Sequence, residues 1–157
     1  VKLIDKKIIS VVDIEKEKVS WDWGEKDWDG QHAPTVLENG NILIFDNGKY
    51  KRRYSRIIEL NPVTKKIEWE YKASPPESFF SELRGRCQKL PNGNILITDS
   101  DNGHVFEITR DNKVVWEFYN PAIKESKDKG TSRSIIPRME RLSADRLRTI
   151  QQAKETK

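Results

Sequence analysis

The chain has 157 residues with a formal net charge of +4, of which 35% are hydrophobic and 34% charged, a balance typical of one globular unit. No run approaches the roughly 20 consecutive apolar residues of a membrane-spanning helix, so the sequence predicts no membrane span. Its single cysteine excludes an internal disulfide, and no Cys/His cluster has the spacing of a zinc site, so we expect no metal.

The chain is built from a repeated unit. Leu37–Ile44 and Leu90–Ile97 match almost residue for residue. Three tryptophans, Trp21, Trp69 and Trp116, follow one another at intervals of 48 and 47 residues, which is the spacing of β-propeller blades. The repeated tryptophan is interpreted as a packing anchor between blades.

Three copies of the unit follow in chain order. The first is incomplete, because Ile9–Ile14 and Val19–Trp23 supply only its second half. Each later copy is predicted to hold four short antiparallel strands, with an Asn-Gly pair in the turn between the first two, since glycine accepts the positive φ that a tight turn requires. The predicted strands are Gln31–Leu37, Asn41–Asp46, Tyr54–Leu60 and Ile67–Tyr71, then Arg86–Leu90, Asn94–Asp99, His104–Thr109 and Val114–Tyr119.

The tail carries most of the net charge. From Tyr119 to Lys157 there are ten Lys or Arg against five Asp or Glu, and no aromatic residue after Tyr119 could stack on bases, so we expect a solvated helix face and no nucleic-acid partner. Ser134–Arg141 could form one more strand. Ser143 is placed to cap a final helix, whose apolar stripe favours packing on the propeller flank over binding a partner; the stripe is Leu147, Ile150 and Ala153.

These elements predict an all-β fold: a β-propeller fragment of two complete four-stranded blades and partial blades, with a short C-terminal helix. We expect residues 1–121 to form the blades and residues 122–157 a basic tail. A propeller needs roughly four blades to close, so the chain is interpreted as part of a longer protein.

His32 is the residue that the repeat does not explain, because Gly85 stands at its position in the next copy. Since first strands line the channel of a propeller, His32 and the loop Asp46–Tyr54 are expected to share one rim. That loop also carries the cationic cluster Lys51, Arg52 and Arg53. An imidazole there could act as a nucleophile or proton carrier, or be a structural residue.

Two further residues receive structural interpretations. Cys87, opposite Pro34, is expected to be a small buried hydrophobe rather than a reactive thiol. His104 opens a third strand away from the channel; it is aligned with Ser55 and interpreted as a polar surface residue.

These motifs together resemble the arylsulfotransferase family, also called arylsulfate sulfotransferases. The resemblance covers about residues 8–121 and rests on three motifs in a fixed order, which is more specific than the Leu-Pro-Asn-Gly-Asn repeat alone. The motifs are Gln31-His32, Phe45-Asp46-Asn47-Gly48 and Tyr54-Ser55-Arg56.

The resemblance implies a six-bladed propeller that moves a sulfuryl group from a phenolic sulfate ester to a phenol through a sulfated histidine, without phosphoadenosine phosphosulfate or another cofactor. His32 matches that histidine, and Asn47 and Arg56 are the local candidates for substrate binding. In the family, further histidines and an arginine come from other blades. The expected partners are therefore a phenolic sulfate donor, a phenol acceptor and the remaining blades, and this segment alone should be inactive.

Two other functions are weighed against this one. A noncatalytic propeller that binds a partner or ligand on its rim would need no histidine at position 32. A quinoprotein-like dehydrogenase would need metal-coordinating carboxylates and a stacking tryptophan at the channel, and the sequence shows no such group.

Overall fold

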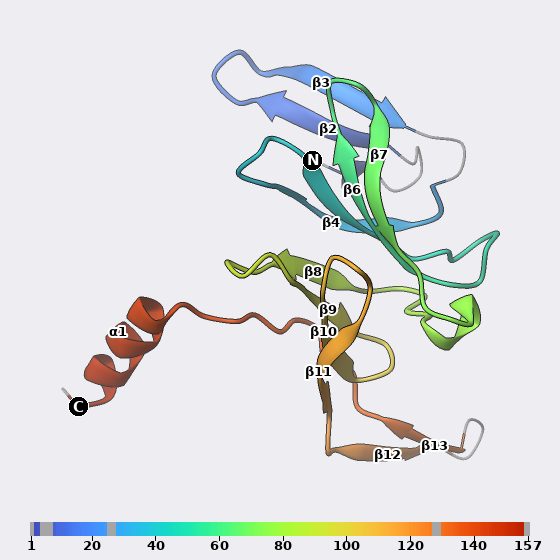
Figure 1. The fold of residues 1–157 in the computed structure, drawn as a ribbon, viewed down its shortest axis with the longest axis vertical. Coiled ribbons are helices and arrows are strands. Elements are labelled where there is room, and N and C mark those ends of the chain that lie inside the picture. The colour runs from blue at the N-terminus through green and yellow to red at the C-terminus, as the bar shows by residue number, and fades with distance from the viewer. Residues whose placement is uncertain (1, 4–7, 25–27, 127–129, 156–157) are drawn as a thin grey trace.

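The computed structural model describes residues 2–3, 8–24, 28–126 and 130–155. Their centre consists of two antiparallel four-stranded sheets, which we call the first and second full blades (Figure 1). All eight predicted strands of these blades are confirmed, with bounds within two residues. The first full blade is β4 (Gln31–Val36), β5 (Ile42–Asp46), β6 (Arg56–Asn61) and β7 (Lys66–Tyr71); the second is β8 (Arg86–Lys89), β9 (Ile95–Asp99), β10 (His104–Ile108) and β11 (Val114–Tyr119).

Smaller elements flank the two blades. The N-terminal sheet has the two predicted strands and one more, in the order β1 (Lys2–Leu3), β2 (Ile8–Asp13), β3 (Lys18–Gly24). A short 3₁₀ helix, η1 (Pro76–Ser78), lies in the connection between the full blades. After β11 the chain forms the two-stranded hairpin of β12 (Ile123–Ser126) and β13 (Gly130–Arg133), then the helix α1 (Ala144–Glu155).

The Asn-Gly turns are held by a glutamate on the third strand. Gly40 has φ +82° and donates its N–H to the Leu37 carbonyl, closing a three-residue hairpin loop. Asn39 and Asn41 both donate side-chain hydrogen bonds to Glu59, at 3.2 and 2.8 Å. The second full blade repeats the arrangement, with Gly93 at φ +85° and two asparagines on Glu107. This shared clamp is the physical reason for the repeated sequence.

The main core lies between the two full blades. Alternating residues of β5 and β6 face Ile95, Ile97 and Phe106 of the second full blade, and Phe79 of the connection fills the space between them. The opposite side chains of β5 and β6 pack with Trp28 and Ile9, against the N-terminal sheet. Strand β5 is therefore buried on both faces, which confirms the predicted face-to-face packing of blades.

The repeated tryptophans join each blade to the next. The Nε1 group of Trp21 donates to the carbonyl of Pro62 at 3.1 Å, and that of Trp69 donates to the carbonyl of Arg110 at 2.9 Å. Trp116 makes no hydrogen bond with the described residues and is 39% exposed, on a strand whose residues are all exposed. The predicted packing anchor is confirmed, and the outer face of the second full blade lacks a neighbouring blade among the described residues.

Two predictions for the tail are wrong. Residues 134–141 run beside the second full blade without forming a strand, because Pro137 has no N–H and the Gln88 side chain, rather than a backbone ladder, binds the N–H and C=O of Arg141. Helix α1 begins as expected, with Ser143 Oγ accepting from the Arg146 N–H. It does not pack on the flank (Figure 1): Leu147 and Ile150 are each 48% exposed, since so narrow an apolar stripe buries little area.

Replacing Trp69 with Phe removes the indole N–H and leaves the Arg110 carbonyl without that donor. We expect the free energy of unfolding to fall by about 1 kcal/mol. The matched control is Trp116→Phe, which removes no hydrogen bond and should cost less. Urea unfolding of both variants measures the difference, and equal losses would contradict the assigned role of the indole N–H.

Candidate functional site

His32 stands at the start of β4, half-buried on the rim that the sequence predicted. Its Nδ1 atom lies 2.9 Å from the Gly30 carbonyl oxygen and 2.5 Å from Oδ1 of Asn47. The histidine and the Asp46–Gly48 segment are thus in direct contact.

The hydrogen bonds of Asn47 fix the protonation pattern of the imidazole. Its Nδ2 donates to the carbonyls of Ser81 and Arg84, both at 2.6 Å, so its Oδ1 must be the atom that faces His32. Two acceptors, Oδ1 and the Gly30 carbonyl, therefore surround Nδ1, which must carry the proton. The lone pair is left on Nε2, and Nε2 has no hydrogen-bond partner among the described residues.

A β-bulge lies directly after His32. Pairing between β4 and β5 shifts register between His32 and Thr35, and Ala33 takes a positive φ of +47°. Pro34 has no N–H to donate to the neighbouring strand, so the bulge loses no hydrogen bond at this residue. Bulges of this kind re-aim side chains at the rims of sheets.

Asp29, which the sequence analysis missed, holds the rim loop in place. Its carboxylate accepts the backbone N–H groups of three consecutive loop residues, and its carbonyl accepts two more. Burial acts to raise the pKa of Asp29, but these hydrogen bonds and the charge of Arg52 outweigh it and hold the pKa below its usual value. An Asp-Gly pair just before a strand was the available signal. The donors are Tyr50, Lys51 and Arg52 to the carboxylate, and Gly48 and Lys49 to the carbonyl.

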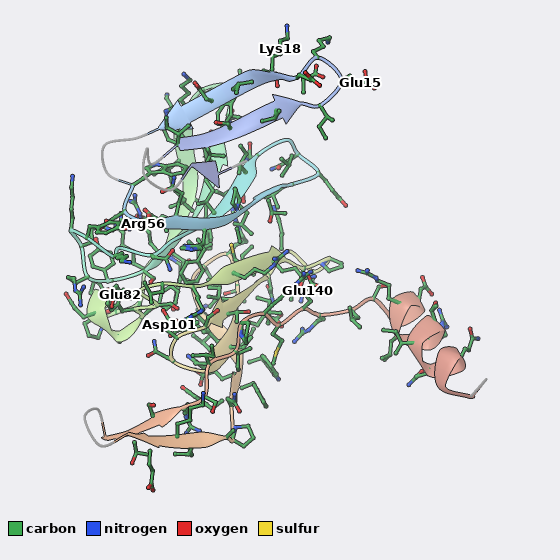
Figure 2. All side chains as sticks on the ribbon, turned by 180° about the vertical axis from the view of Figure 1, so that it is seen from behind. Glu15, Lys18, Arg56, Glu82, Asp101 and Glu140 are labelled. Carbon is green, nitrogen blue, oxygen red and sulfur yellow. The ribbon has the colours of Figure 1, made fainter. Side chains whose placement is uncertain are left out.

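The side chains of Arg56 and His32 do not lie together. Phe45 pairs with His32 and the adjacent Asp46 pairs with Arg56, so the two side chains leave opposite faces of the sheet. Arg56, which is labelled in Figure 2, is 8% exposed. It binds two carboxylates, of Asp46 and Glu70, both at 2.9 Å. Burial acts to lower the pKa of Arg56, and these carboxylates raise it further than burial lowers it.

His104 occupies the place in its blade that Arg56 has in the preceding one. The register pairs Asp46 with Arg56 and Asp99 with His104. The predicted alignment with Ser55 is therefore wrong by one residue. The surface assignment is also wrong, because the side chain of His104 is only 17% exposed and stacks on the ring of Tyr119 at 4.2 Å.

After the exchange of arginine for histidine, Asp99 has no ion pair with any residue that the structure describes. Arg56 spans two carboxylates, whereas Nε2 of His104 reaches only Glu117, at 3.1 Å. Burial raises the pKa of Asp99 to about 6, although hydrogen bonds from Asn102 and Ser81 act in the opposite direction.

The residues that the structure describes do not support thiol or metal chemistry. Cys87 is buried as predicted, and burial raises the pKa of its thiol to about 12, so it is not a nucleophile near neutral pH. In the described ranges, no group of three or more His, Cys, Asp or Glu side chains could hold a metal ion. Nor does any described helix have the length and apolar character needed to cross a membrane.

The stacked four-stranded blades define the chain as an all-β, propeller-like protein. It belongs to the arylsulfotransferase family, whose model (arylsulfotransferase, ASST) matches residues 6–121. A search of curated proteins finds no match.

A solved structure of similar fold is described as that of a protein of unknown function from Bacteroides caccae. It is 14% identical, with a TM-score of 0.53, and the match covers 80% of this chain and 45% of that one. This likeness shows the fold alone. The chain therefore spans less than half the length of this structural relative.

Replacing Asp99 with Asn should stabilise the protein in a pH-dependent way. Because the folded pKa of Asp99, about 6, exceeds the usual 3.8, the contribution of Asp99 to stability is fully present below about pH 4 and is lost as the pH rises to about 6. The variant lacks this loss, so its advantage should grow across that window to about 2–3 kcal/mol. Urea unfolding at several pH values measures it; an advantage that shrinks with rising pH would contradict the assignment.

Proposed function

We propose that this chain supplies the nucleophile of an arylsulfotransferase, with Nε2 of His32 accepting the sulfuryl group from a phenolic sulfate ester. The observation that supports the proposal is the pair of acceptors around Nδ1, Gly30 O and Asn47 Oδ1. A nucleophile needs an unblocked lone pair, and this arrangement leaves one on Nε2.

The proposed reaction has two displacements at sulfur. The Nε2 lone pair attacks sulfur in line as the bond from sulfur to the aryl oxygen breaks, and the phenolate leaves with that electron pair. The sulfated imidazole keeps its Nδ1 proton, held by the two acceptors. In the second step the acceptor phenol gives its proton to the phenolate released in the first step, through water, and its oxygen attacks sulfur as the nitrogen–sulfur bond breaks and that electron pair returns to Nε2. Because the ester itself is the donor, phosphoadenosine phosphosulfate is not needed.

The contacts of Asn47 and Arg56 support positioning roles rather than direct contact with the sulfate. All polar atoms of the Asn47 amide are engaged, by His32 and by two carbonyls of the blade connection. Arg56 binds Oδ2 of Asp46, whose Oδ1 accepts the N–H of Asp29, the residue that holds the rim loop. Asn47 therefore orients His32 by direct contact, whereas Arg56 acts on it only through the scaffold.

We propose that residues 1–121 form the blades and that residues 122–157 form a separate tail. Charge on the transferred oxygens requires preorganised donors. We propose that other blades of a longer propeller contribute them, so activity is expected only when those blades are present.

Replacing His32 with Ala, in a propeller that contains this chain, should lower sulfuryl transfer from p-nitrophenyl sulfate by at least about 10³-fold, because the nucleophile is lost. Absorbance of released p-nitrophenolate measures transfer, and mass spectrometry of the trapped enzyme should locate one added SO₃ group on the peptide that holds His32. Thr64→Ala, on an exposed turn, is the control. A variant that keeps its rate while its melting temperature is unchanged would show that His32 is not the nucleophile, and a wild-type propeller without transfer activity would favour the noncatalytic binding module.

Replacing Asn47 with Ala should lower kcat by about 10²-fold with little change in KM, since the substrate still binds but the imidazole is no longer oriented. Stability should fall by about 2 kcal/mol, because two carbonyls lose their donor. The matched control is Ser100→Ala at the equivalent position of the second full blade, where the buried Oγ has no hydrogen-bond partner among the described residues. A rise in KM alone would indicate direct substrate binding instead.

A further inference from the structure

The N-terminal sheet is a blade that lacks its first strand. Trp21 on β3 pairs with β2 beside a β-bulge, as Trp69 on β7 pairs with β6. Strands β2 and β3 therefore correspond to the third and fourth strands of a full blade, and β1 corresponds to the second. No described strand pairs with the other edge of β1. An open edge of this kind can accept one more strand.

The tail has the opposite defect, because it holds a first strand without a sheet. We call residues 134–142 the tail segment. Within it, residues 139–142 follow β8 by 53 residues, the same interval that separates Leu37 and Leu90, the equivalent hairpin residues of the two full blades. Helix α1 then begins, in place of the hairpin that follows β8. The tail segment therefore corresponds to the first strand of a third blade.

The tail segment contacts the second full blade as β8 contacts the first. Lys89 of β8 forms an ion pair with Glu59 of the first full blade. Arg141 forms one with Glu107, the equivalent glutamate of the second full blade. Ile136 is buried against side chains of β9 and β10. The tail segment is therefore already placed where a third blade would begin.

Trp116 marks the other half of the same missing contact. The indoles of Trp21 and Trp69 donate to carbonyls in the turn between the third and fourth strands of the next blade. The N-terminal sheet has such a turn between β2 and β3, where Ile14 takes the position of Pro62 and is 85% exposed. The kind of acceptor that Trp116 lacks is therefore present at the other end of the chain.

Both ends of the chain expose apolar side chains. On β11 these are Trp116 and Phe118. On the N-terminal sheet they include Val12 and Val19, which pair with each other, and Val12 lies three residues from the buried Ile9 and so on the face away from the core. Within one copy these surfaces cannot meet, because the two full blades stand between the N-terminal sheet and the tail segment (Figure 1).

We propose that each end of this chain binds the other end of a second copy of the same chain. The tail segment of one copy adds to the open edge of β1 in the second copy, and Trp116 donates to the carbonyl of Ile14 there. Each copy offers both ends, so two copies form two such contacts and close a ring. The ring holds two N-terminal sheets and four full blades, a number within the range of propellers. This assembly does not depend on the role of His32.

Sedimentation velocity of the 157-residue chain between about 1 and about 100 μM measures the assembly. We expect a species of twice the 18.4 kDa of one chain, with a Kd of about 10 μM. Ile14→Asp, at an exposed turn, should weaken the dimer at least tenfold by placing a charge in the contact. Trp116→Phe should weaken it about fivefold, because one hydrogen bond is lost; below the Kd this variant has no such bond to lose. The matched control is Val63→Asp, which is equally exposed on the turn between β6 and β7, whose neighbouring blade is already in place, and should leave the Kd unchanged.

Amide hydrogen exchange tests the strand addition separately. The N–H groups of residues 138–142 should exchange more slowly in the dimer, whereas those of α1 should exchange equally fast in both states. Equal exchange of residues 138–142 in monomer and dimer would rule out the added strand. A chain that stays monomeric at about 100 μM would overturn the proposal and leave both ends to other blades of a longer propeller. A dimer that Ile14→Asp leaves intact, or species that grow beyond two copies with concentration, would overturn it as well, because the contact would then lie elsewhere or fail to close.

Discussion

The candidate site depends on one side-chain amide. Asn47 donates to two carbonyls of the connection that leads into the second full blade and accepts from the imidazole of His32. The same group therefore ties two blades together and sets which imidazole nitrogen keeps its lone pair. Because the amide is fully buried, its hydrogen bonds do not compete with water, and leaving any of them unmade would be costly. The hydrogen bonds of Asn47 therefore determine both how the two blades pack and which nitrogen of His32 carries the proton.

The repeat shows how one framework supports different chemistry at equivalent positions. Both blades hold their Asn-Gly turns on a third-strand glutamate, and both place a carboxylate on each side of the residue that begins the third strand. Arginine in that place neutralises both carboxylates and forms a buried ion-pair cluster. Histidine neutralises neither fully, and the result is an aspartate with a raised pKa. A single exchange thus replaces a buried ion-pair cluster with a carboxyl group of raised pKa.

Much of this architecture could be predicted from the sequence, because the hairpin loops and the alternation of apolar residues are local signals. The eight blade strands, the buried Cys87 and the contact between His32 and the Asp46–Gly48 segment all followed from the repeat. The residues that hold the site did not, since they act across long sequence separations: Asp29 binds a loop more than twenty residues away, and Asn47 binds carbonyls more than thirty residues away. The misalignment of His104 arose because a third strand has no turn motif at its start to fix the register.

The chemistry proposed for His32 requires that Asn47 and Gly30 hold its proton on Nδ1 and leave Nε2 free. Long-range proton–nitrogen correlation NMR on the ¹⁵N-labelled chain, above the pH at which the imidazole becomes charged, reports the tautomer of each ring directly. We expect a protonated Nδ1 and an unprotonated Nε2 at His32, and a mixture of tautomers once Asn47 is replaced by Ala. A ring with its proton on Nε2 in the wild type would rule out this role for His32, because the nitrogen proposed to attack sulfur would then have no lone pair to offer.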